Sequence, residues 1–254
     1  HGSLYGIVSS RIDENGFERK RNFMIQISNL SKKYGETVVF SDLNYTFENA
    51  CIYGLVGRNG AGKTTLLNIL SNYDKNYTGV ISIDRKKMNK VDYLDMPVAY
   101  AMDQPSFFNE LTIYENLLLI ASGRKIKKQE AFDKIERILD GLGLKKYENY
   151  SPLELSKGTM QRLNNACAMI QEEKITIFDE PFSGLDPVQM KLLENVIVEF
   201  HKKEKGIYII SSHDIECLQN VCDKCLLLHN GQIREINMEE VDREEIAKIL
   251  SEGE

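Results

Sequence analysis

The sequence predicts an α/β fold built around a mainly parallel β-sheet. Two patterns support this prediction. Apolar runs of strand length alternate with stretches of helical periodicity through the second half of the chain, which is typical of parallel strands joined by crossover helices. A glycine-rich loop at 57–62 also joins an apolar run to a helical stretch. The 254 residues are enough for one large domain or two modest ones.

The composition limits the classes of function that the protein is expected to have. Hydrophobic residues make up 42% and charged residues 28% of the chain, as in an ordinary globular protein. Acidic residues outnumber basic ones by 38 to 32, with a net charge of −6, so we expect no nucleic-acid partner. No apolar run approaches the roughly 20 residues that a membrane-spanning helix needs. The five cysteines indicate a reducing compartment, and the pair Cys222 and Cys225 is interpreted as small hydrophobes rather than as metal or redox ligands.

Both ends of the chain are expected to lie outside the main domain. His1, Gly2 and Ser3 resemble the remnant of an affinity tag. Residues 1–23 are therefore interpreted as a tag-derived extension, with Met24 as the natural start. The main domain is expected to cover residues 24–236, and residues 237–254 are expected to form a short helical tail.

The first half of the domain begins with strands. Short β-like patterns fill the region 24–56 and end in the apolar run 51–56, so we expect several strands there. After the glycine-rich loop, leucines and isoleucines at one-turn spacing predict a helix from Thr64 to Tyr73. Further strands are expected at 80–83 and 97–102.

The second half continues the alternation of helices and strands. Phe132, Ile135 and Leu139 recur at helical spacing, so the region between about 110 and 150 is expected to be a mostly helical insertion. Asn230-Gly231 favours a tight hairpin, because both turn positions need a positive φ. The remaining expected elements are a helix near 156–172, a strand at 175–178, a helix near 187–204, a strand at 207–210, and the two hairpin strands at 225–228 and 232–236.

The glycine-rich loop has the spacing of a phosphate-binding loop. Residues 57–64 follow the pattern G-x-x-x-x-G-K-[ST], and a position between a strand and a helix directs backbone N–H groups and the helix dipole at an anion. Lys63 is expected to reach the β- and γ-phosphates of a nucleotide, and the Thr64 hydroxyl to bind Mg²⁺. The predicted nucleotide-binding residues here are Gly57, Arg58, Asn59, Gly60, Ala61, Gly62, Lys63, Thr64 and Thr65.

Two acidic residues follow the apolar strand at 175–178. Asp179, just beyond the apolar run, is placed to bind Mg²⁺ directly or through water. The adjacent Glu180 can point toward the γ-phosphate and act as a general base on an attacking water. With the phosphate loop, this pair predicts a site that hydrolyses a nucleotide.

A short segment before that strand resembles the signature motif of ABC-type ATPases. The family motif is usually written L-S-G-G-Q, and residues 155–159 read Leu-Ser-Lys-Gly-Thr, so three of the five positions match. Lys157 and Thr159 are the two departures. The matching Ser156 and Gly158 suit the N-terminus of a helix that approaches an anion.

The resemblance implies roles for further residues. Asp186 ends a Ser-Gly-Leu-Asp segment similar to the family's D-loop, and His213 follows a strand as the family's switch histidine does. Gln104 stands where the family has a glutamine that contacts the metal and the attacking water, and Tyr34 where it has an aromatic residue that stacks on adenine. The implied catalytic residues are Glu180, His213, Gln104 and Lys63; the implied metal ligands are Thr64, Gln104 and Asp179; and Ser156, Gly158 and Asp186 join the nucleotide contacts.

The resemblance also implies an architecture and a function. The implied fold is a phosphate-loop ABC ATPase core with an N-terminal antiparallel β subdomain and a helical subdomain at about 107–165. The implied protein hydrolyses MgATP and forms an ATP-dependent homodimer or a pair with another ATPase subunit. It is expected to power a transporter, a bacterial exporter, on the cytoplasmic face of the membrane through a separate transmembrane permease. The alternative is an ABC ATPase for cofactor assembly or complex remodelling without a membrane subunit. A nucleotide binder without turnover is disfavoured by Glu180.

Overall fold

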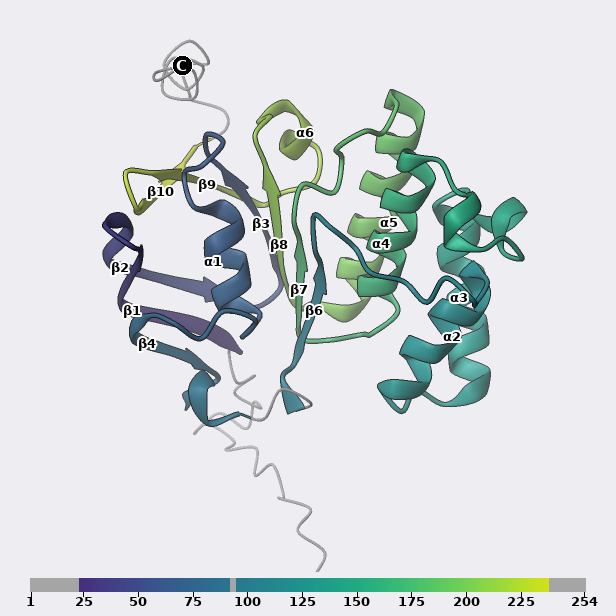
Figure 1. Ribbon diagram of the computed structural model, residues 1–254, viewed down its shortest axis with the longest axis horizontal. Helices are drawn as coiled ribbons and strands as arrows, with labels where there is room; N and C mark the ends of the chain where they lie inside the picture. The colour runs from purple at the N-terminus through teal and green to yellow at the C-terminus, as the bar shows by residue number, and fades with distance from the viewer. Residues whose placement is uncertain (1–22, 92–94, 238–254) are drawn as a thin grey trace, which may run out of the picture.

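A computed structural model describes residues 23–91 and 95–237 and contains two sheets (Figure 1). The smaller sheet is antiparallel, with the strand order β2-β1-β4-β5, and the larger sheet has the order β10-β9-β3-β8-β7-β6. The predicted extension at 1–23 and the predicted tail at 237–254 fall almost wholly outside the described residues. The α/β fold is confirmed.

The antiparallel sheet forms one side of the molecule. Its strands are β1 (Met24–Tyr34), β2 (Thr37–Glu48), β4 (Thr78–Ile83) and the short β5 (Lys86–Lys87). Ile25 pairs with Phe47 on one side and with Ile83 on the other, and all three side chains are buried. Alternate apolar residues therefore give this sheet one buried face, which is the basis on which the strands were predicted.

The larger sheet is the core of the fold. Its strands are β3 (Cys51–Val56), β6 (Val98–Ala101), β7 (Ile175–Phe178), β8 (Ile207–Ser212), β9 (Lys224–His229) and β10 (Gln232–Ile236). Every residue of β3, β7 and β8 is buried, as expected for parallel strands that are covered on both faces. Among the described strands of this sheet only β10 runs antiparallel, paired with β9 across the predicted Asn230-Gly231 turn, where φ is 48° and 70°.

Helices cover both faces of the larger sheet. Figure 1 shows α1 (Lys63–Leu70) between the two sheets, and α4 (Lys157–Met169) and α5 (Pro187–Glu204) on the opposite face. The outermost layer on that face contains α2 (Ile113–Gly123) and α3 (Lys128–Gly141), which confirm the predicted helical insertion. The short helices are η1 (Met88–Lys90), η3 (Lys145–Tyr147), η4 (Pro152–Glu154) and α6 (Glu216–Gln219).

Some element boundaries differ from the sequence prediction. The predicted helix 64–73 ends at Leu70, because Asn72 adopts a left-handed conformation with φ 62° and closes the helix end with its N–H. The strand predicted at 207–210 continues through Ser211 and Ser212. The expected subdomain boundary at 165 falls inside α4, which packs on β6 and β7 and also contacts α2. The helix that begins with the signature-like segment is therefore shared between the outer helices and the core.

The two sheets are also joined by a hydrogen bond. The side chain of Gln232 at the start of β10 donates to the carbonyl of Ser41 in β2 at 2.7 Å, which links the edges of the two sheets.

All five cysteines are free thiols, of which Cys51 and Cys225 are buried. Within residues 23–91 and 95–237, no helix is long and apolar enough to cross a membrane.

Candidate active site

The glycine-rich loop leaves β3 and turns directly into α1. Gly62 has φ 100°, and a Cβ there would lie 2.7 Å from Cγ1 of Val39, so the position requires glycine. The N–H of Ala61 donates to the carbonyl of Arg58 at 3.1 Å, which closes a turn inside the loop. Within the described residues no side chain caps α1. The N–H groups of its first turn are therefore not occupied by a side-chain cap, and their binding of an anion stays a prediction.

Lys63 lies under this loop and is only 6% exposed. Its Nζ donates to the carbonyl oxygen of Gly57 at 2.7 Å and lies 3.4 Å from Oε1 of Glu180. The loop thus holds a buried ammonium group at the point where a nucleotide's terminal phosphates would meet the acidic pair.

Asp179 is buried at the end of β7, with 1% of its surface exposed. Its Oδ1 accepts a 2.5 Å hydrogen bond from the Ser211 hydroxyl. Burial raises the pKa of this carboxyl, while hydrogen bonds from Ser211 and Thr64 oppose the rise. A buried carboxylate beside the Thr64 hydroxyl is an oxygen donor set suited to Mg²⁺, so the residues present fit the metal that the sequence predicted.

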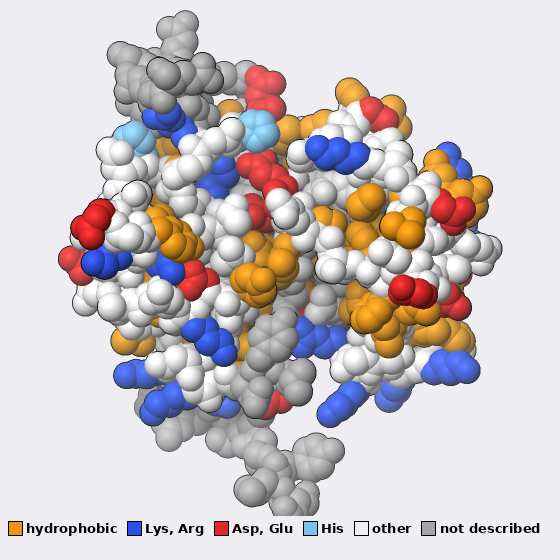
Figure 2. Space-filling view, in the orientation of Figure 1, with side chains coloured by type: hydrophobic (Ala, Val, Ile, Leu, Met, Phe, Trp, Pro, Cys, Tyr) orange, Lys and Arg blue, Asp and Glu red, His pale blue; other side chains and the backbone are white. Residues whose placement is uncertain are grey.

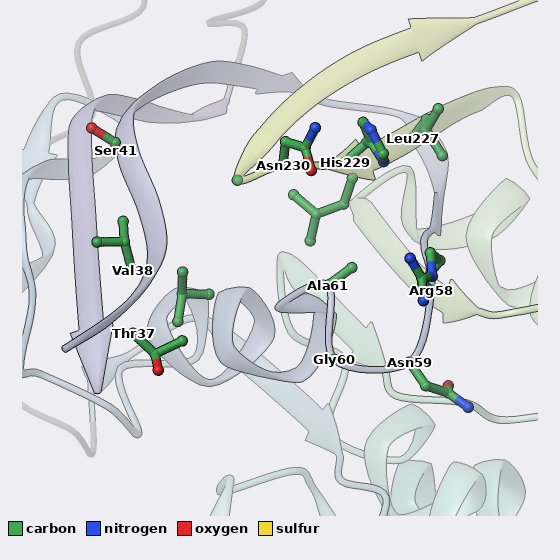
Figure 3. Close-up of a pocket in the computed structure, with 13 residues that line it drawn as sticks. Thr37, Val38, Ser41, Arg58, Asn59, Gly60, Ala61, Leu227, His229 and Asn230 are labelled. Carbon is green, nitrogen blue, oxygen red and sulfur yellow. The ribbon is translucent and has the colours of Figure 1, made fainter. Parts of the chain in front are cut away.

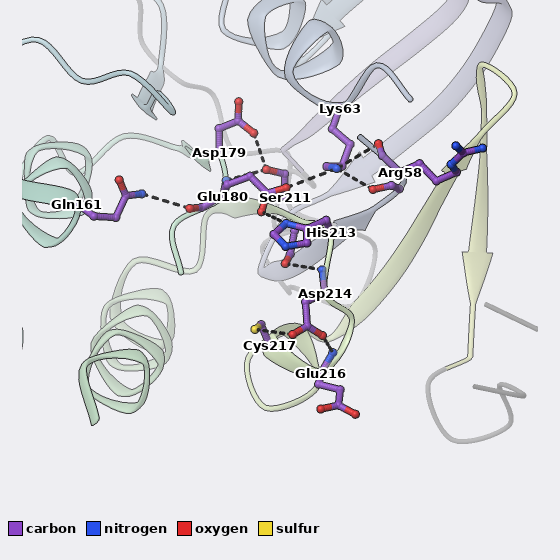
Figure 4. A network of polar contacts seen from close by, with 12 residues as sticks. Arg58, Lys63, Gln161, Asp179, Glu180, Ser211, His213, Asp214, Glu216 and Cys217 are labelled. Carbon is purple, nitrogen blue, oxygen red and sulfur yellow. Dashed lines mark hydrogen bonds and ion pairs between the residues drawn. The ribbon is translucent and has the colours of Figure 1, made fainter. Parts of the chain in front are cut away.

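Glu180 turns away from the strand toward Lys63 and His213. Its φ is 48°, a left-handed conformation that residues other than glycine seldom adopt. Its Oε2 lies 2.9 Å from Nδ1 of His213, while Oε1 faces Lys63, as Figure 4 shows. The predicted general base therefore lies between a cation and the predicted switch histidine.

Lys63, Glu180 and His213 line one cavity of about 500 Å³ above the loop, whereas Asp179 and Gly57 are not among its lining residues. Tyr34 lies at its rim, and a second hollow of about 460 Å³ adjoins it between β2, the loop and the β9–β10 turn (Figure 3). The two hollows share Thr37, Val39, Arg58, Asn59 and Gly60, whereas Ala61 lines only the second. The residues that line the first cavity are Tyr34, Thr37, Val39, Arg58, Asn59, Gly60, Gly62, Lys63, Thr64, Thr65, Asp103, Glu180, Ser183 and His213.

The aromatic ring of Tyr34 is covered on one face and free on the other. Its side chain is 52% exposed, and Nζ of Lys32 lies 4.5 Å from the ring centroid. The Tyr34 hydroxyl donates to Oδ2 of Asp74 at 3.1 Å, and Asp74 also pairs with Lys32 at 2.7 Å. This network fixes the ring at the rim of the cavity, where an adenine could stack on it.

The signature-like segment lies at a different cavity. Ser156 caps α4 by accepting from the N–H of Thr159, and the two hydroxyl oxygens are 2.8 Å apart. Ser156, Thr159 and Asp186 line a hollow of about 750 Å³. Gly158 packs so closely on α5 that a Cβ would lie 3.0 Å from Oε1 of Gln189. Ser156 and Asp186 are therefore not brought into the phosphate-loop cavity of the same copy.

Gln104 is also not brought into that cavity. It follows β6 as expected but is exposed, and the neighbouring Asp103 lines the cavity instead. The roles predicted for Gln104 stay predictions.

Sequence reasoning missed two polar residues that hold the acidic pair. Ser211 in β8 accepts from the N–H of Glu180 at 2.8 Å, in addition to its bond with Asp179. Gln161 in α4 donates from Nε2 to the carbonyl of Glu180 at 3.2 Å. A serine directly after the apolar run 207–210 was a usable signal for the first, because neighbouring parallel strands end at the same edge of the sheet. The signal for Gln161 was its place in the segment Gln161-Arg162-Leu163, which follows the signature-like motif and also resembles the family, but the resemblance assigned it no role.

Comparison with known proteins decides the family. The model of the family described as "ABC transporter" matches residues 40–183, more than half of the chain. The chain belongs to the ABC transporter ATP-binding proteins. An uncharacterized ABC transporter ATP-binding protein of Methanocaldococcus jannaschii is 32% identical to this ABC ATPase over 208 residues, covering 82% of this chain and 75% of the relative.

Further relatives and a solved structure agree with this assignment. A bacitracin transport ATP-binding protein of Enterococcus faecalis is 30% identical, covering 87% of this chain and 71% of its own length. A tungstate uptake system ATP-binding protein of Peptoclostridium acidaminophilum is 30% identical and is covered over 97% of its length. The solved structure of an ATP-binding subunit of an ABC transporter superposes with a TM-score of 0.78 at 26% identity, covering 90% of this chain and 95% of that one. The protein is therefore an ATPase whose ATP hydrolysis is coupled to transport.

Proposed function

We propose that this ABC ATPase hydrolyses MgATP in the cavity above residues 57–65, with Glu180 as the general base. The observation that carries the proposal is the position of the Glu180 carboxylate, 3.4 Å from Nζ of Lys63 and 2.9 Å from Nδ1 of His213. A carboxylate beside the expected position of the terminal phosphate can accept a proton from the attacking water. His213 would orient that carboxylate through its ring nitrogen.

Lys63, Asp179 and Thr64 complete the proposed phosphate and metal contacts. On nucleotide binding, the Lys63 ammonium group would exchange its bond with the Gly57 carbonyl for phosphate oxygens and offset charge in the transition state. Asp179 and the Thr64 hydroxyl would hold Mg²⁺, which neutralises phosphate charge when bound.

We also propose that two copies share each ATP site. Ser156 and Asp186 lie at their own hollow rather than at the phosphate-loop cavity of the same copy. A second copy could bring the N-terminus of α4, with its exposed Ser156, against a nucleotide held by the first. This arrangement supports an ATP-dependent homodimer.

A transmembrane permease is the proposed further partner. Exposed apolar side chains on and beside the outer helices include Phe108, Leu119, Tyr150 and Leu153, and Figure 2 shows apolar side chains gathered over that part of the molecule. Such a patch is typical of a protein interface, and we infer that it meets the permease at the cytoplasmic face of the membrane. Export as the direction of transport stays a prediction, because the relatives include an uptake system. A membrane-free role in remodelling is the alternative.

Replacement of Lys63 tests the proposed site. In Lys63→Ala, phosphate release from MgATP should fall below detection while the far-UV circular dichroism spectrum stays unchanged, because the cation that holds the terminal phosphates is lost. The control Lys86→Ala removes an exposed lysine of β5 and should keep wild-type turnover. Near-normal ATP hydrolysis by a folded Lys63→Ala protein would refute the site.

A further inference from the structure

The backbone of Glu180 is held in an unfavourable conformation by its neighbours. With φ at 48°, this residue is in a region of backbone conformation that costs free energy and that persists only where the surroundings impose it. Its N–H donates to Oγ of Ser211 at 2.8 Å, and its carbonyl accepts from Nε2 of Gln161 at 3.2 Å and from the N–H of Ser183 at 3.1 Å. This backbone conformation directs the carboxylate out of the strand, toward Lys63 and His213.

The side chain of Ser211 replaces backbone pairing just beyond the end of the β7–β8 ladder. Backbone pairing of β7 with β8 ends at Phe178 and Ile210. The next residue of β8, Ser211, is fully buried and uses its hydroxyl both to accept from Glu180 and to donate to Asp179. The serine therefore fixes the two acidic residues relative to each other.

Gln161 reaches Glu180 from the helix that begins at Ser156. Its side chain is 9% exposed. Asn164 and Asn165 lie on the same face of α4, and their amide groups donate to the carbonyls of Met102 and Pro181 at 2.7 Å and 3.2 Å. Three amides of α4 thus bind the backbone just after β6 and β7, and Figure 4 shows the one that contacts Glu180.

We propose that Gln161 is a positioning residue for Glu180 and joins the signature helix to the general base of the same copy. The inference rests on the proposed function, because it concerns the Glu180 carboxylate of that site. The N-terminus of α4 is the part that would meet the nucleotide of the second copy. Because Gln161 binds the carbonyl of Glu180, the position of α4 fixes the backbone conformation that directs the Glu180 carboxylate. The residue touches no substrate and acts only through Glu180.

A pair of glutamine variants tests the inference. Gln161→Met keeps a similar length but removes the amide donor. The control Gln171→Met, just beyond α4, removes an amide that donates to the Cys167 carbonyl at 2.9 Å, away from Glu180. We expect kcat of Gln161→Met to fall at least tenfold, with the Kd for a fluorescent ATP analogue and the KM for ATP within twofold of wild type. Gln171→Met should keep kcat within twofold.

A double-mutant cycle separates positioning from a general structural effect. In single-turnover assays in the Glu180→Gln background, Gln161→Met should lower the residual rate less than twofold, because no general base remains to be aimed. A wild-type kcat for Gln161→Met, or an equal fall in both backgrounds, would overturn the inference alone. A wild-type protein that binds the analogue but releases no phosphate would overturn the proposed function and this inference with it.

Discussion

At the scale of single residues, Tyr34 presents one ring face to the cavity because Lys32 occupies the other. The lysine is itself fixed by a 2.7 Å contact with Asp74 and by a bond to the Asn76 carbonyl. A ring held in this way loses little conformational freedom when a flat ligand stacks on it. The hydroxyl group contributes only a bond to Asp74 outside the stacking face.

Tyr34→Ala should therefore weaken nucleotide binding, whereas Tyr34→Phe should not. Loss of an aromatic contact worth about 0.5 to 1.5 kcal/mol corresponds to an affinity loss of roughly 2- to 13-fold. Titration with a fluorescent ATP analogue measures this loss. Tyr73→Ala is the control, because Tyr73 is exposed and does not line the cavity. Equal affinities for wild type and Tyr34→Ala would mean that Tyr34 is not a stacking platform.

The residues that could be predicted are those that lie within contiguous motifs. Lys63 and Thr64 belong to one loop, and Asp179 and Glu180 directly follow one apolar strand, so spacing alone identified them. The bonds to Glu180 from Gln161 and Ser211 span 19 and 31 residues of sequence. Such bonds depend on how α4 and β8 pack beside β7, and no local pattern encodes that packing.

At the scale of elements, α4 is attached to α3 by a buried arginine. Arg162 is 5% exposed, and its Nη1 donates to the carbonyls of Leu142 and Gly143 at 2.7 Å and 3.3 Å, just beyond the end of α3. Its Nη2 donates to Oγ1 of Thr159, which itself pairs with Ser156. The guanidinium group thus satisfies free carbonyls at a helix C-terminus, where positive charge is favoured.

Arg162→Met should lower the free energy of unfolding by about 2 kcal/mol, because it leaves buried carbonyls and the Thr159 hydroxyl without this charged donor. Urea unfolding followed by circular dichroism measures the change. Arg137→Met is the matched control, since Arg137 on α3 makes an exposed 3.7 Å contact with Glu199 and lies 4.6 Å from the centroid of the Phe200 ring, and it should change stability by no more than about 1 kcal/mol. Equal denaturation midpoints for the two variants would contradict this role of Arg162.

The order and type of the elements could be predicted, but several of their ends could not. Strand and helix periodicities identified β3, β7, α5 and the β9–β10 hairpin. The end of α1 is set by the left-handed Asn72, and β8 is extended by two serines that an apolar pattern does not include. The pairing order of the larger sheet was also not predicted, because it depends on contacts between distant segments.

At the scale of the whole molecule, the two halves of the expected ATP site face different hollows. The phosphate loop, Asp179 and Glu180 belong to one region, and Ser156 with Asp186 belongs to another. In this chain Thr159 takes the position of the family's glutamine and pairs its hydroxyl with Ser156, while Lys157 beside it is exposed. A second copy is therefore needed to complete each proposed site, and the altered signature segment must still permit that contact.

The most direct test of this account is the Glu180→Gln variant, studied by size-exclusion chromatography with light scattering, with and without MgATP, alongside phosphate release. The amide keeps the side-chain length but cannot accept a proton, so the rate should fall by about 10² to 10⁴. The variant should also accumulate as a dimer in MgATP, because ATP remains bound and one negative charge facing the phosphates is removed from each site. Hydrolysis at the wild-type rate, or a variant that binds ATP and stays monomeric, would contradict the account.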